Sequence, residues 1–300
     1  MQSDMRRDRP VRLYLLAGVK TAPHFMEGLR EALAAKLADA GCTVHSELLF
    51  PYGDWSRSAV AQLREMRHDL QLRFGRYERS IGGRRALEAM ETPAPAGRTI
   101  LIGHSGGGVA AVHAAQLRLA RDGGEPDAAV MIGSPRCRIP EALRGSVLYL
   151  YAAGKRLRRD AGAGAPVTER EQEGAGEPVR ERVGVEGLKR EGAGVPVHER
   201  ETPGEPVREH EGAREGVRKP ADPICRIGSF GGWRAAGAFR VPAWQADKYA
   251  PAAVRGVPIL GGHADYFRRS APFVNDAGQS NLEMTLAAVW PWLAERMLNS

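Results

Sequence analysis

The stretch that decides the fold is RTILIGHSGGG, residues 98–108. Its first five residues form a short apolar run typical of a buried β-strand, and the alanine-rich residues 109–120 that follow are typical of a helix. Glycines stand between the two, which predicts a sharp turn leading directly from the strand into the helix. Ser105 lies at the tip of this predicted turn.

Apolar stretches of strand length recur on both sides of this unit, with helical patterns between them. We expect strands at residues 11–17, 43–50, 99–103, 128–132, 146–151 and 257–260. We expect helices at residues 25–40, at 56–90 with a break near 80–83, at 109–120 and at 282–297. This alternation predicts the α/β class, with a mostly parallel, doubly wound sheet flanked by helices on both faces.

Residues 160–219 differ from the rest of the chain. They contain no aromatic residue, and the unit G-x-P-V-x-E begins at Gly164, Gly176, Gly194 and Gly204. Such a composition cannot build a core, and the uneven spacing is unlike that of stacked repeats. We therefore expect one domain made of residues 1–159 and 220–300, interrupted by a disordered low-complexity insertion whose partner protein the sequence does not identify.

The composition argues against several classes of protein. The formal charge is +7, but no basic run is interleaved with aromatic residues, so we expect no nucleic-acid partner. No stretch approaches the roughly 20 apolar residues of a transmembrane helix, and the charged N-terminus is unlike a signal peptide, so we expect a cytoplasmic protein. Cys42, Cys137 and Cys225 lie far apart without C-x-x-C spacing, and we expect no disulfide, metal or cofactor.

Ser105 has the sequence surroundings of a catalytic nucleophile. A sharp strand-to-helix turn needs small residues on both sides of the serine, and Gly103 and Gly107 meet that need. We interpret His104 as part of the turn, because adjacent side chains point apart there. The alternative is a glycine-rich turn that binds phosphate or only connects two elements, but the lysine of a Walker-type loop is absent.

Two backbone N–H groups near Ser105 are candidates to stabilise negative charge on a substrate oxygen. The N–H of Gly106 is the first, since N–H groups in the first turn of a helix have no intrahelical partner and lie at the positive end of its dipole. The second comes from the loop after the first predicted strand, at Gly18 and Val19, where such folds place an oxyanion donor.

A serine nucleophile also needs a base and an acid, in the chain order Ser, Asp or Glu, then His. His263 follows the apolar residues 257–260 and a Gly-Gly turn, which puts it at the carboxyl edge of the sheet with Ser105. For the acid we prefer Asp222, which precedes an ordered apolar segment, because the acid must hold one imidazole tautomer from a fixed loop. Asp160, at the start of the insertion, is the alternative, and Asp265 ranks last.

Four motifs resemble those of the class 3 lipases, a branch of the α/β hydrolases. The family's G-H-S-x-G-G is similar to residues 103–108, and its G-S-P-R is matched by residues 133–136. Its acid motif, D-x-V-P-R-L-P, is similar to DPICRIG at residues 222–228, and its late histidine corresponds to His263, followed by Tyr266. The resemblance implies the α/β-hydrolase fold and, independently of the loop argument, the acid at residue 222.

The expected function is therefore that of a serine hydrolase that cleaves carboxylic esters of a small molecule or lipid through an acyl-enzyme on Ser105. Thioester hydrolysis and acyl transfer share its tetrahedral intermediate and stay open. A non-catalytic binding module with the same fold is the alternative from another class, against which the ordered Ser, Asp and His argue. The chain departs from the lipases in having Gly106 where leucine is usual and in lacking an apolar lid helix and a secretion signal.

Overall fold

The computed structural model describes residues 9–72, 75–91, 97–153, 221–236 and 241–298. The insertion expected to be disordered, residues 160–219, lies outside the described residues, and so does Asp160.

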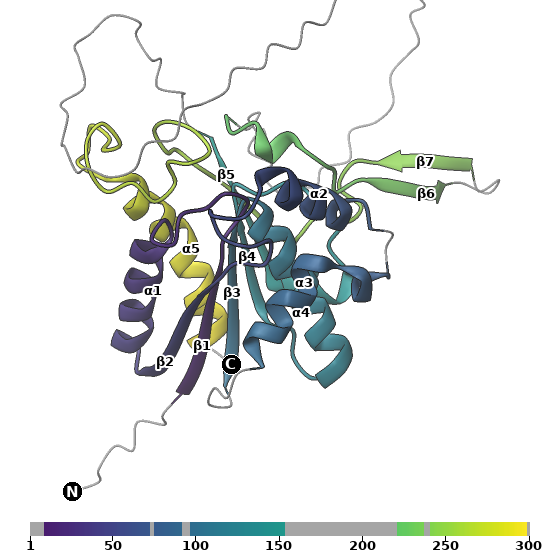
Figure 1. Cartoon of the computed structure of the whole chain (residues 1–300), viewed down its shortest axis with the longest axis horizontal. Coiled ribbons are helices and arrows are strands. Elements are labelled where there is room, and N and C mark those ends of the chain that lie inside the picture. Colours follow the sequence, from purple (N-terminus) through teal and green to yellow (C-terminus); the bar gives the residue numbers. More distant parts are fainter. Residues whose placement is uncertain (1–8, 73–74, 92–96, 154–220, 237–240, 299–300) are drawn as a thin grey trace, which may run out of the picture. The chain divides into compact units, whose positions relative to one another are not determined.

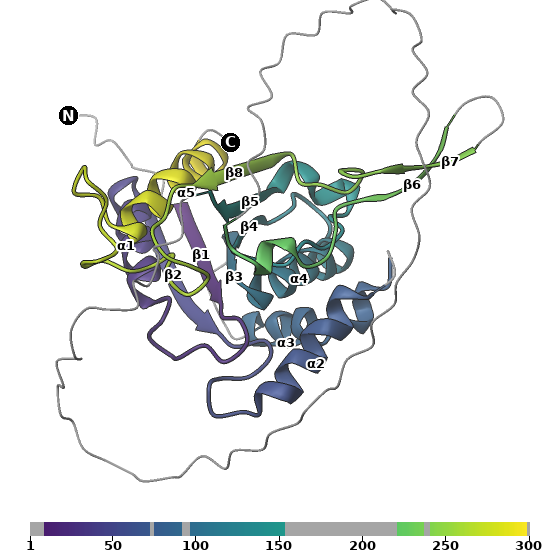
Figure 2. The same ribbon diagram turned by 90° about the horizontal axis from the view of Figure 1, so that it is seen from above.

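Six strands form one parallel sheet in the order β2-β1-β3-β4-β5-β8 (Figures 1 and 2). The strands are β1 (Arg9–Leu16), β2 (Cys42–Leu49), β3 (Arg98–His104), β4 (Ala128–Ile132), β5 (Val147–Ala152) and β8 (Ala253–Val257). The predicted α/β class with a parallel sheet is confirmed. Because β8 pairs with β5, the segments before and after the insertion contribute to the same sheet.

The observed strands lie within two residues of the predicted ranges, except for the last one. The predicted strand at residues 257–260 is wrong, since β8 ends at Val257. Pro258 has no N–H to give to a neighbouring strand. The preceding residues were missed because β8 is an edge strand whose residues alternate between partly buried and exposed, without the continuous apolar run of the inner strands.

Helices cover both faces of the sheet (Figures 1 and 2). On one face lie α1 (Glu27–Asp39) and α5 (Asn281–Leu298), and on the other lie α2 (Ala59–Leu70), α3 (Ile81–Met90) and α4 (Gly106–Asp122). Alternate residues of each inner strand enter the two cores, as the pleat requires: Leu13 and Leu15 pack toward α1 and α5, while Tyr14 and Leu16 pack toward α4. None of the helices in the described ranges is long and apolar enough to cross a bilayer.

The stretch at residues 56–90 is broken into α2 and α3 as expected, but the break lies earlier than predicted, between Leu70 and Ile81. Residues 80–83, where the break was expected, are the N-cap and first turn of α3. A 3₁₀ turn at Tyr77–Arg79 precedes Ser80, which caps α3 by accepting a hydrogen bond of 2.9 Å from the Gly83 N–H. Helix α4 begins at Gly106, three residues before the predicted start. There are two further 3₁₀ turns. Glu141–Ser146 directly precedes β5, and Ile224–Arg226 lies just after Asp222.

A short antiparallel hairpin of β6 (Gly232–Ala236) and β7 (Val241–Gln245) was not expected from the sequence. Trp233 and Trp244 face each other across it, with ring centroids 5.5 Å apart, and both rings are exposed. Phe230, just before the hairpin, is instead buried against Tyr149 of β5. The periodicity of so short a ribbon is broken by Pro242, which explains why it was missed.

Candidate active site

The candidate site lies where the strand order reverses. After β1 the chain moves to β2 on one side, and it later returns to β3 on the other side of β1. In open parallel sheets ligands bind outside the carboxyl ends of the strands at such a point. The loop after β1, with Gly18 and Val19, and the turn after β3, with Ser105, meet at this edge of the sheet.

Ser105 has a backbone conformation that is rare outside glycine. Its φ is 55° and its ψ is −130°, and the next residue, Gly106, begins α4. Its N–H donates a hydrogen bond of 3.0 Å to the carbonyl oxygen of Ile132, at the end of the adjacent β4. A strained residue held by surrounding structure is the geometry of a strand-turn-helix nucleophile.

The glycines around Ser105 are required by close backbone approaches. A Cβ atom on Gly103 would lie 2.2 Å from the carbonyl carbon of Gly107, and one on Gly107 would lie 2.0 Å from the carbonyl oxygen of Leu16. No side chain fits at such distances, so the start of α4 packs directly on β1 and β3. The turn can form only with glycine at both positions.

His263 and Asp222 lie together although 41 residues separate them in the chain. His263 Nδ1 is 2.8 Å from Asp222 Oδ2. The Asp222 side chain is fully buried, while that of His263 is about one quarter exposed. A buried carboxylate on Nδ1 directs the other ring nitrogen, Nε2, to act as the acceptor, which is the arrangement of a general base.

Asp222 is held in its ionised form. Burial acts to raise its pKa, but the hydrogen bonds from His263, from the Ile224 N–H at 2.9 Å and from Tyr266 outweigh it, so that the pKa lies below its usual value. Gly133 of the G-S-P-R motif completes the surroundings, since a Cβ atom there would lie 3.0 Å from Asp222 Oδ2. The carboxylate is therefore fixed and charged at neutral pH.

The other acids take no part in this arrangement among the described residues. Asp265 Oδ2 accepts a hydrogen bond of 2.8 Å from the Gly262 N–H and shapes the turn before His263. Asp160, the alternative acid, lies outside the described residues.

No hydrogen bond joins Ser105 Oγ to His263 in the part of the chain that the structure describes. Hydrogen bonds between a nucleophile and its base are often long without substrate and tighten when the complex forms. The two residues are instead connected through His104. Its ring stacks on that of His263 with centroids 4.7 Å apart, and its Nε2 lies 3.0 Å from the His263 carbonyl oxygen.

The loop after β1 lies directly against Ser105. A Cβ atom on Gly18 would lie 2.7 Å from Ser105 Cβ and 3.2 Å from its Oγ. The N–H of Val19, next in the loop, makes no hydrogen bond to any described residue. The N–H of Gly106 lies in the first turn of α4, where helices leave such donors free. Of the three predicted donor residues, Gly106 follows the serine in the chain, Gly18 lies against its side chain, and Val19 follows Gly18 in the loop.

Gln62 of α2 fixes this loop, a role that no sequence pattern indicated. Its fully buried side chain accepts a hydrogen bond of 2.8 Å from the Lys20 N–H through Oε1. Its Nε2 donates to the carbonyl oxygens of Asp54, at 2.6 Å, and Arg57, at 3.1 Å. Lys20 has a positive φ of 53°, so the loop carries a second strained residue beside the site.

A second cluster of Ser, His and Asp, formed by Asp69, Ser80 and His113, lies between α2, α3 and α4. Ser80 Oγ donates to Asp69 Oδ2 and lies near His113 Nδ1, both at 2.9 Å. Asp69 also accepts from the Ile81 and Gly82 N–H groups at the start of α3. The cluster therefore caps the start of α3. Ser80 is fully buried and donates its proton to a carboxylate, so it lacks the exposure and the free oxygen of a nucleophile.

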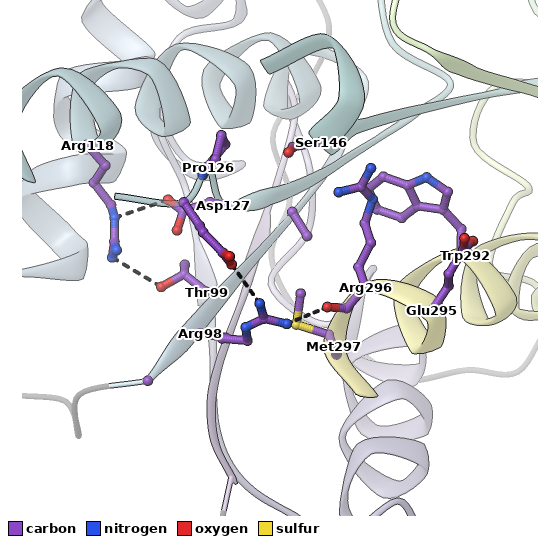
Figure 3. Close-up of a pocket in the computed structure, with 13 residues that line it drawn as sticks. Arg98, Thr99, Arg118, Pro126, Asp127, Ser146, Trp292, Glu295, Arg296 and Met297 are labelled. Carbon is purple, nitrogen blue, oxygen red and sulfur yellow. Dashed lines mark hydrogen bonds and ion pairs between the residues drawn. The ribbon is translucent and has the colours of Figure 1, made fainter. Parts of the chain in front are cut away.

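A cavity of about 640 Å³ lies at the opposite end of the sheet, near the amino ends of β3 and β4 (Figure 3). Ion pairs line it: Arg118 Nε is 3.0 Å from Asp127 Oδ2, and Arg98 is 2.7 Å from Glu125. Burial, opposed by Arg118 and Arg12, raises the pKa of Asp127 to about 6. Its distance along the strands from Ser105 separates this cavity from the candidate site.

Within the described ranges, no group of three or more His, Cys, Asp or Glu side chains could hold a metal ion. No protein-family model matches the chain, and comparisons with curated proteins and with solved structures found no match.

Proposed function

We propose that the protein is a serine hydrolase of the α/β-hydrolase type that cleaves carboxylic esters. The observation that supports it most is the hydrogen bond between His263 and the buried Asp222 at the sheet edge where Ser105 forms a strained strand-to-helix turn. The resemblance of four sequence motifs to those of the class 3 lipases also supports this proposal.

In the proposed mechanism, His263 Nε2 removes the proton from Ser105 Oγ as the oxygen attacks the ester carbonyl carbon. The carbonyl π electrons move to the oxygen, where the N–H groups of Gly106 and of the Gly18–Val19 loop stabilise the negative charge. Collapse of this intermediate expels the alcohol, which takes the proton from His263. Water then cleaves the acyl-enzyme by the same steps.

Asp222 holds the Nδ1–H tautomer of His263 and stabilises the imidazolium that forms. This role needs an ionised carboxylate, which the lowered pKa of Asp222 supplies. Thioester hydrolysis and acyl transfer pass through the same intermediate, and the choice among them depends on the acceptor that reaches the acyl-enzyme.

The decisive experiment compares the wild-type protein with Ser105→Ala. We expect the variant to lose p-nitrophenyl ester hydrolysis and labelling by a fluorophosphonate probe, with an unchanged thermal unfolding curve, because only the nucleophilic oxygen is removed. Ser80→Ala is the matched control, since Ser80 lies in the other Ser, His and Asp cluster, and it should keep its label. Labelling that survives in Ser105→Ala would remove Ser105 from its role.

A further inference from the structure

His104 makes two contacts with the proposed base, although it belongs to the turn of the proposed nucleophile. Its ring is stacked on the His263 ring, with an angle of 26° between the planes. Its Nε2 is 3.0 Å from the carbonyl oxygen of the same residue. The two histidines are 159 positions apart in the chain, so this contact joins the turn after β3 to the loop after β8.

The protonation of His104 follows from its surroundings. Burial, followed by the charge of His263, lowers the pKa of His104 to about 3, so the ring is neutral at the pH of a histidine base. A carbonyl oxygen can only accept a hydrogen bond, and Nε2 must therefore carry the proton. Nδ1, buried and without a hydrogen-bond partner in the described ranges, is then the bare nitrogen.

The ring has little freedom to leave this position. The aromatic rings of Phe25, Tyr266 and Phe267 surround it, with centroids at 5.0, 5.7 and 5.4 Å. Its backbone is part of β3, at the centre of the sheet. By contrast, His263 lies on a loop beyond the edge strand β8. Its position therefore depends on contacts with other parts of the chain, such as the contact with His104.

We propose that His104 is a positioning residue that sets the place of the base relative to the nucleophile, through its hydrogen bond to the His263 carbonyl. Asp222 fixes the rotation and tautomer of the imidazole from one side. The Nε2–H of His104 fixes the backbone of His263 from the other, in a frame rigidly connected to Ser105. This inference rests on the proposed function and adds to it a residue that touches no substrate.

Two substitutions separate the hydrogen bond from the ring stack. His104→Gln puts an amide N–H at about the position of Nε2 and removes the ring. His104→Phe keeps a ring and removes the donor. A loop that shifts by about 1 Å costs a reaction of this kind about 10²-fold in rate. We therefore expect kcat to fall by about 10²-fold in His104→Phe with KM unchanged, and to stay within about tenfold of wild type in His104→Gln.

Two readouts distinguish positioning from packing. The downfield proton resonance of the His263–Asp222 hydrogen bond should shift or broaden in His104→Phe and persist in His104→Gln, and the acidic limb of the pH profile of kcat/KM should move only in His104→Phe. Loss of thermal stability alone moves neither readout. If His104→Phe keeps the wild-type kcat and pH profile, the inference is wrong.

The wild-type protein supplies a test that does not depend on the folding of a variant. With nitrogen-15-labelled histidine, His104 should show a protonated Nε2 and a bare Nδ1 throughout the pH range in which the protein is active. A His104 that titrates there, or carries its proton on Nδ1, overturns the inference. Ser105→Ala in the same assays separates the two proposals. If Ser105→Ala remains active, the proposed function is wrong. If Ser105→Ala is inactive and His104→Phe has wild-type activity and pH profile, only the positioning role is wrong.

Discussion

The hydroxyl group of Tyr266 lies 3.1 Å from Asp222 Oδ2, and both side chains are fully buried. The same hydroxyl accepts a hydrogen bond of 2.8 Å from the Ala152 N–H at the end of β5. Because the hydroxyl oxygen accepts this hydrogen bond through a lone pair, its own proton remains available to be donated to the Asp222 carboxylate. Tyr266 thus links the proposed acid to the end of β5, an inner strand of the sheet.

Removal of this hydroxyl should therefore impair both stability and catalysis. In Tyr266→Phe we expect the free energy of unfolding to fall by about 1–3 kcal/mol, as for a lost hydrogen bond that leaves a buried group unsatisfied. We expect kcat to fall about tenfold, because the carboxylate then loses one of the hydrogen bonds that fix it. Denaturant unfolding and ester hydrolysis measure the two effects.

Tyr52→Phe is the matched control for this variant. Tyr52 is also fully buried, and its hydroxyl donates to a carboxylate, Asp69, at 3.0 Å, outside the proposed triad. It should lose a similar amount of stability with kcat unchanged. If both variants show the same kcat, Tyr266 serves the fold only.

The contact of Gly18 with Ser105 leads to a second prediction. In Gly18→Ala the new methyl group would approach Ser105 Cβ to 2.7 Å and the His104 carbonyl oxygen to 2.9 Å, so the loop must move away from the serine. Misplacing an oxyanion donor costs about 10²–10³-fold in kcat. We expect this loss with KM little changed, measured with p-nitrophenyl esters.

Gly145→Ala is the control for the added methyl group, because the nearest atom to its Cβ is 3.9 Å away. It should leave kcat unchanged. An active Gly18→Ala enzyme would mean that the loop after β1 contributes no donor to the reaction.

A third prediction concerns Asp127. Burial raises the pKa of its carboxyl group to about 6. The folded protein then binds a proton that the unfolded chain releases near pH 3.8, so Asp127 favours folding below that pH and loses its contribution as the pH rises through about 6. Between about pH 4 and pH 7, we expect the free energy of unfolding of Asp127→Asn to rise by about 2 kcal/mol relative to wild type. Denaturant unfolding across this range measures it.

Asp122→Asn gives a control of opposite sign. The hydrogen bond from Arg121 lowers the pKa of Asp122, so its stabilising effect is present above the usual carboxyl pKa and disappears as the pH falls. Relative to wild type, this variant should lose stability as the pH rises. A stability difference for Asp127→Asn that does not depend on pH would contradict the raised pKa.

Local sequence was sufficient for the parallel sheet because inner strands buried on both faces are continuous apolar runs, and helices that cover them repeat every three to four residues. The turn at Ser105 could also be predicted from the sequence, because glycine is required at residues 103 and 107, where any side chain would block the close approach of the backbone. The edge strand β8 and the β6–β7 hairpin were not, because exposed strands alternate or break the pattern.

The sequence by itself determined the class of the fold and a short set of candidates: one serine, a late histidine and three acids. Only the tertiary structure decided that Asp222 and His104 both contact His263, and that Gln62 and Tyr266 are hydrogen-bonded to the loop after β1 and to Asp222. These contacts join residues that lie 41 to 159 positions apart. Such contacts depend on how strands and loops pack in three dimensions, which a pattern of neighbouring residues does not encode.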